Sequence, residues 1–234
     1  MLQFARIPEL AQRDRFVRRA VKDGRVYTLE DEQNASVSSQ KYTARTVQLF
    51  WSSALEGRRW AEALTGSGAL QEISLPTFAA DILPGLAAEK GLVGTDWVAD
   101  PIESEVDPRD LLLRLKHEAL PAELSLIRER GEVFLLASPE GPLLRPSELR
   151  NGGDVLAIFS SRASAERHKK AGADAAGGAA GAAGADCHII TDPLADFTGS
   201  TLPWATARGL AIACEPIPGA GFVELPAADL AKRL

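Results

Sequence analysis

The sequence repeats itself, and this internal repeat constrains the fold more than any other feature of the chain. Five short blocks of the first half recur in the same order in the second: GRVYTL (24–29) as GEVFLL (131–136), VQLFWSS (47–53) as VLAIFSS (155–161), ISLP (73–76) as ITDP (190–193), LPGLAAEKGLVG (83–94) as LPWATARGLAI (202–212), and VDPRDLLLRL (106–115) as ELPAADLAKRL (224–234). Because such self-similarity marks a duplicated structural unit, we expect two similar units. The sequence predicts one over residues 1–117 and the other over 118–234.

The pattern inside one copy predicts an α+β unit. Its elements are expected, in chain order, at 7–22 (amphipathic helix), 26–29, 35–38 and 46–51 (strands), 54–64 (helix), 70–75 (strand), 76–89 (helix), 92–97 (strand) and 108–116 (helix). Ser53, with Glu56 three residues later, forms a capping box for the helix at 54–64. We expect the first two strands to pair as a hairpin, and the helices to pack on one side of a mainly antiparallel sheet. Two such units related by pseudo-two-fold symmetry make up the expected fold.

The second copy carries an insertion rich in alanine and glycine at residues 171–186. This composition offers little to bury, so it predicts a flexible loop. It does not indicate a phosphate-binding loop, because no Gly-Lys-Ser/Thr follows it. We expect the two units to join near residues 118–123.

Charge and hydropathy exclude several classes of protein. The chain has 26 Lys and Arg against 32 Asp and Glu, a net charge of −6, and no basic face suited to nucleic acid. No apolar run approaches the roughly 18–20 residues that cross a bilayer, and the N-terminus lacks an apolar signal core. We therefore expect a cytoplasmic monomer or homodimer with neither a nucleic-acid nor a membrane partner.

Residue types that carry catalysis are present but are not arranged for it. Cys187 and His188 are neighbours on an expected strand, so their side chains point to opposite faces and cannot share a proton or a metal ion. We predict that Cys187 and Cys214 are free thiols. The cysteines and histidines lack the spacing of metal ligands, so we predict no metal site and no cofactor. Ser52 and Ser53 lack the flanking glycines of a nucleophile elbow, which favours helix capping.

Acidic residues beside a tryptophan form the strongest candidate binding surface. They lie at the end of the strand expected at 92–97 and just after it. A large aromatic at an exposed edge anchors protein interfaces, and neighbouring carboxylates suit a basic protein partner. The alternatives are a tryptophan in the core and a solvated acidic loop. The residues that we predict to bind a partner are Asp96, Trp97, Asp100 and Glu103.

The first half resembles a family known as domain of unknown function 2750. The resemblance rests on GRVYTLED (24–31), LFWSSALEGRRWAEAL (49–64), ISLPTFAADILPGLAAEKGLVGTDW (73–97) and VDPRDLLLRL (106–115), within residues 13–116. The second half is similar, but has Phe159 and His168 where the first has Trp51 and Trp60. The strand, FSS and helix element also resembles the N-terminal domain of SseB-type secretion enhancer proteins. Neither resemblance implies a catalytic residue or a cofactor.

These observations favour a non-enzymatic cytoplasmic protein-binding or regulatory module of an immunity or secretion-associated type. One alternative is a small hydrolase or transferase with a site between the two units. Another is a structural homodimer.

Overall fold

The computed structural model describes residues 7–30, 35–39, 41–65, 68–97, 104–147, 149, 153–176 and 187–234. The chain divides into two compact units, Met1–Ala119 and Leu120–Leu234. This boundary falls after residue 119, where the sequence predicts 117.

Unit 1 combines helices with short strands. Its strands are β1 (Arg25–Leu29), β2 (Ser36–Ser38), β3 (Thr46–Phe50), β4 (Leu70–Ser74), β5 (Leu92–Thr95) and β6 (Glu105–Val106). Its helical segments are α1 (Ile7–Asp23), α2 (Ala54–Thr65), α3 (Leu75–Thr77), η2 (Phe78–Ile82), α4 (Leu83–Ala88) and the first part of α5 (Pro108–Arg130). The segments α3, η2 and α4 follow one another without a break and correspond to the helix expected at 76–89.

The strands of unit 1 form two hydrogen-bonded groups joined by one bridge. β4 pairs with β1, and the second group has the order β2-β3-β5-β6. The backbones of Tyr27 and Trp51 exchange two hydrogen bonds of 2.8 Å and connect β1 to the end of β3. All pairs are antiparallel except β3 with β5. The predicted hairpin of β1 with β2 is wrong, because β2 pairs with β3 and β1 takes β4 as its partner; its turn includes 31–34, which lie outside the described residues.

Unit 2 has a larger continuous sheet. Its strands are β7 (Glu132–Ser138), β8 (Gly141–Pro142), β9 (Leu144–Pro146), β10 (Asp154–Phe159), β11 (His188–Pro193), β12 (Ala211–Cys214) and β13 (Val223–Pro226). Its helical segments are the end of α5, α6 (Arg162–Ala176), α7 (Leu194–Asp196), η3 (Phe197–Thr201), α8 (Leu202–Ala207) and α9 (Ala227–Ala231). The sheet has the order β11-β7-β10-β12-β13, with β8 on β7 and β9 on β10.

The two units share strand order and register. The order β4-β1-β3-β5-β6 of unit 1, counted through the bridge, matches β11-β7-β10-β12-β13 of unit 2, and β2 matches β9. Tyr27 lies opposite Trp51 just as Phe134 lies opposite Phe159. In each unit one parallel pair, β3 with β5 or β10 with β12, stands among antiparallel pairs. The α+β fold class, with mainly antiparallel sheets, is thus confirmed.

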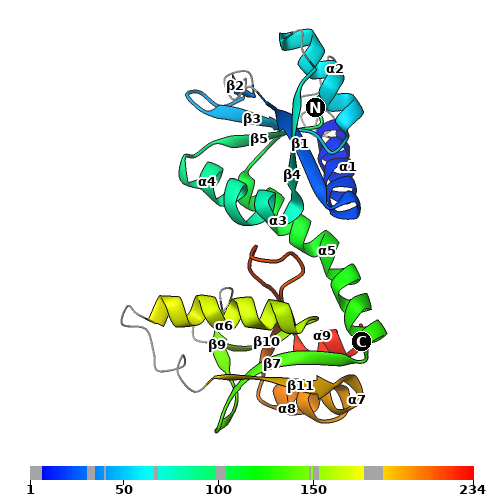
Figure 1. Cartoon of the computed structure of the whole chain (residues 1–234), viewed down its shortest axis with the longest axis vertical. Helices are drawn as coiled ribbons and strands as arrows, with labels where there is room; N and C mark the ends of the chain where they lie inside the picture. Colours follow the sequence, from blue (N-terminus) through cyan, green and yellow to red (C-terminus); the bar gives the residue numbers. More distant parts are fainter. Residues whose placement is uncertain are drawn as a thin grey trace. The chain divides into compact units, whose positions relative to one another are not determined.

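Helices cover both faces of the sheet in unit 2, not one face as we expected. Leu156 and Ile158 of β10 pack with α5 and with the α7 to α9 region, whereas the alternate residue Phe159 packs with Ala165 of α6. Figure 1 shows α6 on one side of this sheet and α7 and α8 on the other. After Asp154 every residue of β10 is buried, which is typical of a strand covered on both sides.

Two helices extend beyond their expected ends. The helix expected to stop near 116 continues as α5 to Arg130, because Glu118, Ala119 and Leu120 are good helix formers, and it passes through Pro121. α6 continues to Ala176, so the first residues of the predicted flexible loop are helical. The remainder of that insertion, 177–186, lies outside the described residues.

Candidate functional site

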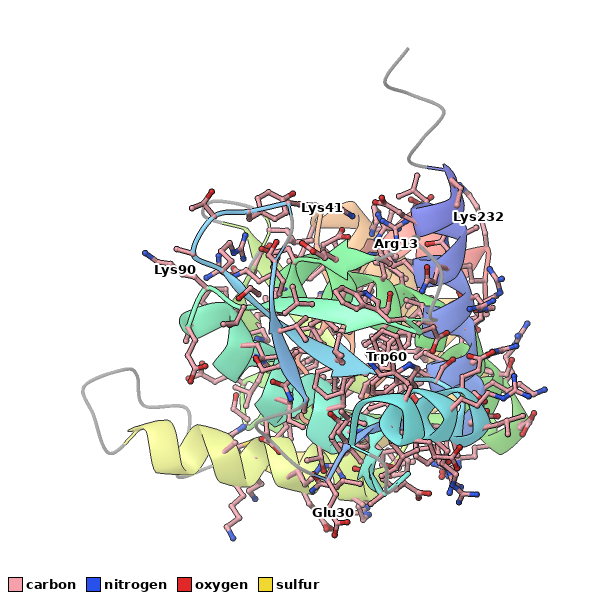
Figure 2. All side chains as sticks on the ribbon, turned by 90° about the horizontal axis from the view of Figure 1, so that it is seen from above. Arg13, Glu30, Lys41, Trp60, Lys90 and Lys232 are labelled. Carbon is pink, nitrogen blue, oxygen red and sulfur yellow. The ribbon has the colours of Figure 1, made fainter. Side chains whose placement is uncertain are left out.

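Three tryptophans form the core on one face of unit 1. The rings of Trp51 and Trp60 lie 6.4 Å apart, and those of Trp60 and Trp97 lie 6.5 Å apart, measured between centroids. Trp51 Nε1 donates to the Trp97 carbonyl at 2.9 Å, and Trp97 Nε1 donates to the Ser104 carbonyl at 3.0 Å. Figure 2 shows Trp60 on α2 directed toward the strands. These contacts fix the chain after β5 against the sheet.

Asp96, which directly follows β5, is fully buried. It lies in the left-handed region with φ 50°, and its two oxygens accept from Ser52 N at 2.6 Å and Ser52 Oγ at 2.8 Å. Gln12 Nε2 donates to the Asp96 carbonyl, and Arg15 Nε lies 3.7 Å from Oδ2. Burial raises the pKa of the Asp96 carboxyl, while the hydrogen bonds from Ser52 oppose that rise. The carboxylate therefore holds the turn between β3 and α2.

The exposure expected of Asp96 and Trp97 is not seen, since their exposed fractions are 0% and 4%. The reason is that both groups have partners inside unit 1: the indole donates to the Ser104 carbonyl, and the carboxylate accepts from Ser52. Asp100 and Glu103 lie outside the described residues. Of the four residues predicted to bind a partner, the structure describes only Asp96 and Trp97, and both are buried.

The other singled-out residues have structural surroundings. Cys187 and Cys214 are buried free thiols, and His188 is exposed. Burial raises the pKa of the Cys214 thiol to about 12. Ser53 Oγ accepts from the backbone of Glu56 at 3.5 Å, a long version of the predicted cap. Within the described residues, no group of three or more His, Cys, Asp or Glu side chains is arranged to hold a metal ion.

The equivalent face of unit 2 carries smaller aromatic rings. Phe159 and His168 lie 5.4 Å apart, and His168 and Phe222 lie 4.8 Å apart in a T-shaped arrangement. Phe159 ends β10 and His168 lies on α6, whereas Trp51 directly follows β3 and Trp60 lies on α2. Phe222 comes from the segment before β13 and contacts His168 much as Trp97 contacts Trp60. A phenyl and an imidazole here fill less space than two indoles.

A pocket of about 500 Å³ opens beside these rings; we call it the unit 2 pocket. Its lining residues come from β9, α6 and the segment between β12 and β13: Arg145, Arg167, His168, Lys170, Ala171, Glu215, Gly219, Gly221 and Phe222. The Arg145 guanidinium lies over the Phe222 ring at 4.5 Å, and Arg145 Nη1 lies 3.1 Å from His168 Nε2. Cationic groups from two separate elements thus converge on one pocket.

Glu215 supplies the acidic group of the unit 2 pocket. Glu215 Oε1 accepts from Gly219 N at 2.9 Å, and Arg167 Nη2 lies 3.5 Å from Oε2. Oε2 is buried and has no hydrogen-bond donor among the described residues. Burial raises the pKa of the Glu215 carboxyl, against the lowering effects of the Gly219 amide and Arg167.

The electrostatics of the unit 2 pocket favour an anion. Burial lowers the pKa of His168, and the positive charges of Arg145 and Arg167 lower it further, which favours the neutral imidazole. Among the described lining residues, three are cationic and one is a carboxylate, a local excess of positive charge on a chain of net charge −6. Local charge of this kind attracts anions independently of net charge.

A larger pocket of about 780 Å³ lies in unit 1, where Arg45 and Asp107 are engaged in structural contacts. Arg45 donates to the carbonyls of Lys90 and Gly91 at 2.7 and 2.9 Å. Asp107 accepts from the backbone of Arg109 at 2.9 Å and lies 3.9 Å from Arg45. These bonds join the end of α4 to the start of α5, which is a structural role.

Comparison with known proteins gives one family match and one weak structural match. The family described as "Protein of unknown function (DUF2750)" matches residues 13–115, nearly the whole of unit 1. A solved structure described as "Anabaena Tic22 (protein transport)" is 12% identical, with a TM-score of 0.26 over 94% of this chain and 97% of its own. That score is too low to support an inference about function. No curated protein matches the sequence.

None of the helices in the described part of the chain is both long and apolar enough to cross a membrane.

Proposed function

We propose that the chain is a non-enzymatic regulatory binding module whose ligand site is the unit 2 pocket, and that this site takes an anionic group. The observation that carries the proposal is the convergence of Arg145, Arg167 and Lys170 on one pocket in an otherwise acidic chain. A pocket of this volume lies within the range of small-molecule sites.

Two features support binding over a purely structural role. Arg145 is held in place by the Phe222 ring, so little of its side-chain freedom remains to be lost on binding. Arg167 donates to Ser164 Oγ at 2.9 Å and is half exposed, with 49% of its side chain accessible. One cation is thus preorganised and another is accessible at the opening.

The test compares two arginines in matched surroundings. Arg167 donates to the serine three residues earlier on α6, and Arg128 donates in the same way to Ser125 on α5 at 3.0 Å. Only Arg167 lines the pocket. We expect inorganic phosphate to bind the wild-type protein in isothermal titration calorimetry, Arg167→Gln to weaken binding about tenfold, and Arg128→Gln to leave it unchanged. Absence of saturable binding, or equal losses in both variants, contradicts the proposal.

We further propose that the protein acts in the cytoplasm and that a basic protein partner contacts the acidic segment that includes Asp100 and Glu103. The support for the basic partner is the sequence pattern of carboxylates after β5. Reversing both charges to lysine should abolish recovery of that partner in a pull-down from native lysate, whereas reversal at the exposed Glu89 should not. Unchanged recovery with the reversed charges contradicts this part of the proposal.

We also infer that the two units descend from one duplicated module. The shared strand order and register support this inference.

A further inference from the structure

The two units place a buried carboxylate at the same point of the fold but satisfy it differently. Asp96 is the first residue after the β3–β5 ladder, and Glu215 is the first after the β10–β12 ladder. Both oxygens of Asp96 accept hydrogen bonds from Ser52. Only Oε1 of Glu215 accepts one, from Gly219.

The serine that could satisfy Glu215 has another partner. Ser160 occupies in unit 2 the position of Ser52, directly after the aromatic residue that ends β10. It donates hydrogen bonds from both its backbone and its side chain to Glu123 on α5. Glu215 is therefore left with Oε2 buried and with the Arg167 guanidinium 3.5 Å away, which pairs with its charge without a well-aligned hydrogen bond.

A buried oxygen without a donor costs free energy that a bound molecule can recover. Only 6% of the Glu215 side chain is exposed, and the residue lines the unit 2 pocket. Leaving a buried charged acceptor unsatisfied is unfavourable, so a ligand that brings an O–H or N–H group to Oε2 gains more than the same bond gives in water. The acceptor lies beside the cations that attract an anion.

These observations together define a ligand with two functional groups. An anionic group would contact Arg145, Arg167 and Lys170, and a neighbouring hydroxyl would donate to Glu215 Oε2. Arginine guanidinium groups recognise phosphate through paired parallel hydrogen bonds, and a phosphate monoester carries about two negative charges at pH 7, so it suits a lining that includes Arg145 and Arg167.

We propose, resting on the anion-binding function above, that the unit 2 pocket binds a phosphate monoester of a polyhydroxylated molecule, the chemistry shared by sugar phosphates and nucleoside monophosphates. The cations hold the phosphate, and Glu215 selects the hydroxyl-bearing part. Carboxylates accept hydrogen bonds from sugar hydroxyls in other nucleotide sites for the same chemical reason. Glu215 is thus a specificity-determining residue.

The experiment measures one ratio of dissociation constants by isothermal titration calorimetry at low ionic strength. The ligands are inorganic phosphate, ribose 5-phosphate, adenosine monophosphate and ribose. For the wild-type protein we expect ribose 5-phosphate to bind about tenfold or more tightly than inorganic phosphate, since a hydrogen bond to a charged group contributes that much. Adenosine monophosphate binding more tightly still identifies the nucleotide source, and equal affinity identifies the sugar phosphate.

The Glu215→Gln variant separates recognition from structural support. The amide keeps an acceptor for Gly219 but removes the negative charge. We expect it to bind inorganic phosphate at least as tightly as the wild-type protein and to lower the preference for ribose 5-phosphate to under about threefold. If Glu215 only supported the structure, its replacement would lower the affinities for inorganic phosphate and for ribose 5-phosphate together.

The possible failures are distinguishable. If no anion binds to the wild-type protein, the proposed function and this inference fall together. If inorganic phosphate binds but ribose 5-phosphate gains nothing over it, or the preference survives in Glu215→Gln, only the inference about hydroxyl recognition is overturned. The wild-type comparison decides the question if the variant does not fold.

Discussion

A methyl group added at Gly94 tests the packing that buries the residues after β5. An ideal Cβ at this position would lie 2.7 Å from Leu49 Cδ2, and 3.0 Å from both Val47 Cγ1 and Trp97 Nε1. All three neighbours are buried and belong to one core, so none can move into solvent. Any movement of the Trp97 indole also weakens its hydrogen bond to the Ser104 carbonyl.

The magnitude follows from three contributions. Overpacking a core by one methyl costs about 2 kcal/mol. A weakened hydrogen bond adds about 1 kcal/mol, and the lower entropy of the unfolded alanine chain returns about 0.7 kcal/mol. We therefore expect Gly94→Ala to lower the free energy of unfolding of unit 1 by about 2 kcal/mol.

Urea unfolding followed by far-UV circular dichroism measures this change. With a typical slope of about 2 kcal/mol per molar urea, the midpoint of unit 1 should fall by about 1 M. Gly85→Ala is the control, because nothing lies within 4 Å of its Cβ on α4, and it should raise stability by about 0.5–1 kcal/mol. At the equivalent position of unit 2, Ala213 lies opposite Ala157, whereas Gly94 in unit 1 lies opposite the larger Leu49. A Gly94→Ala midpoint at or above that of the wild-type protein would refute the reasoning.

Further predictions concern the left-handed residues and the buried carboxylate. Lys90, with φ 58°, follows the end of α4 at the position that Gly209, with φ 66°, has after α8. A left-handed backbone disfavours lysine, so Lys90→Gly should stabilise unit 1 and Gly209→Lys should destabilise unit 2. We expect each change in the free energy of unfolding to be about 1 kcal/mol in thermal unfolding. Asp96→Ala leaves the Ser52 donors unsatisfied and should cost about 3 kcal/mol, while Asp96→Asn should cost less than half of that in the same assay. The folded-state pKa of Asp96 is raised above 3.8, so the folded chain binds a proton at this carboxyl more tightly than the unfolded chain does. The stability of the wild-type protein relative to Asp96→Asn should therefore be highest near pH 4 and decline as pH rises through the folded-state pKa. A difference that is constant from pH 4 to pH 8 would contradict this assignment.

The sequence predicted most elements because local patterns determine them. Gly24 and Gly131 end their helices with φ 68°, and Pro84 and Pro203 stand in the first turns of α4 and α8. Strand partners were less predictable, since β1 and β4 are separated by about forty residues and no local signal joins them. The predicted hairpin of β1 with β2 failed for this reason.

Alignment of the two copies by letters is wrong at the block ISLP (73–76). Matching ISLP to ITDP by letters pairs Leu75 with Asp192. The structure instead matches Leu75 with Leu194, because their backbone amides donate to the carbonyls of Gly24 and Gly131 at 2.8 and 2.7 Å. The alignment by letters is therefore shifted by two residues, within a strand whose residues alternate in a similar way in both copies.

The candidate site could not be predicted from the sequence. Arg145, Arg167 and Glu215 are distant in the chain, and no spacing rule connects them. The signal that was present was the replacement of Trp51 and Trp60 by Phe159 and His168 in the second copy. In the sequence alone that replacement is a departure from the family pattern, and only the fold shows that cationic side chains surround it.

The distribution of indoles makes the two units optically unequal. Trp51, Trp60 and Trp97 lie together in unit 1, whereas unit 2 has Trp204 with Arg208 over its ring at 4.6 Å. Intrinsic emission therefore originates mainly from unit 1, and closely spaced rings should couple in the near-ultraviolet. A spectral change that accompanies occupation of the Arg145 and Glu215 pocket would report either Trp204 alone or a response carried across to unit 1, and replacing Trp204 with phenylalanine tells these two origins apart.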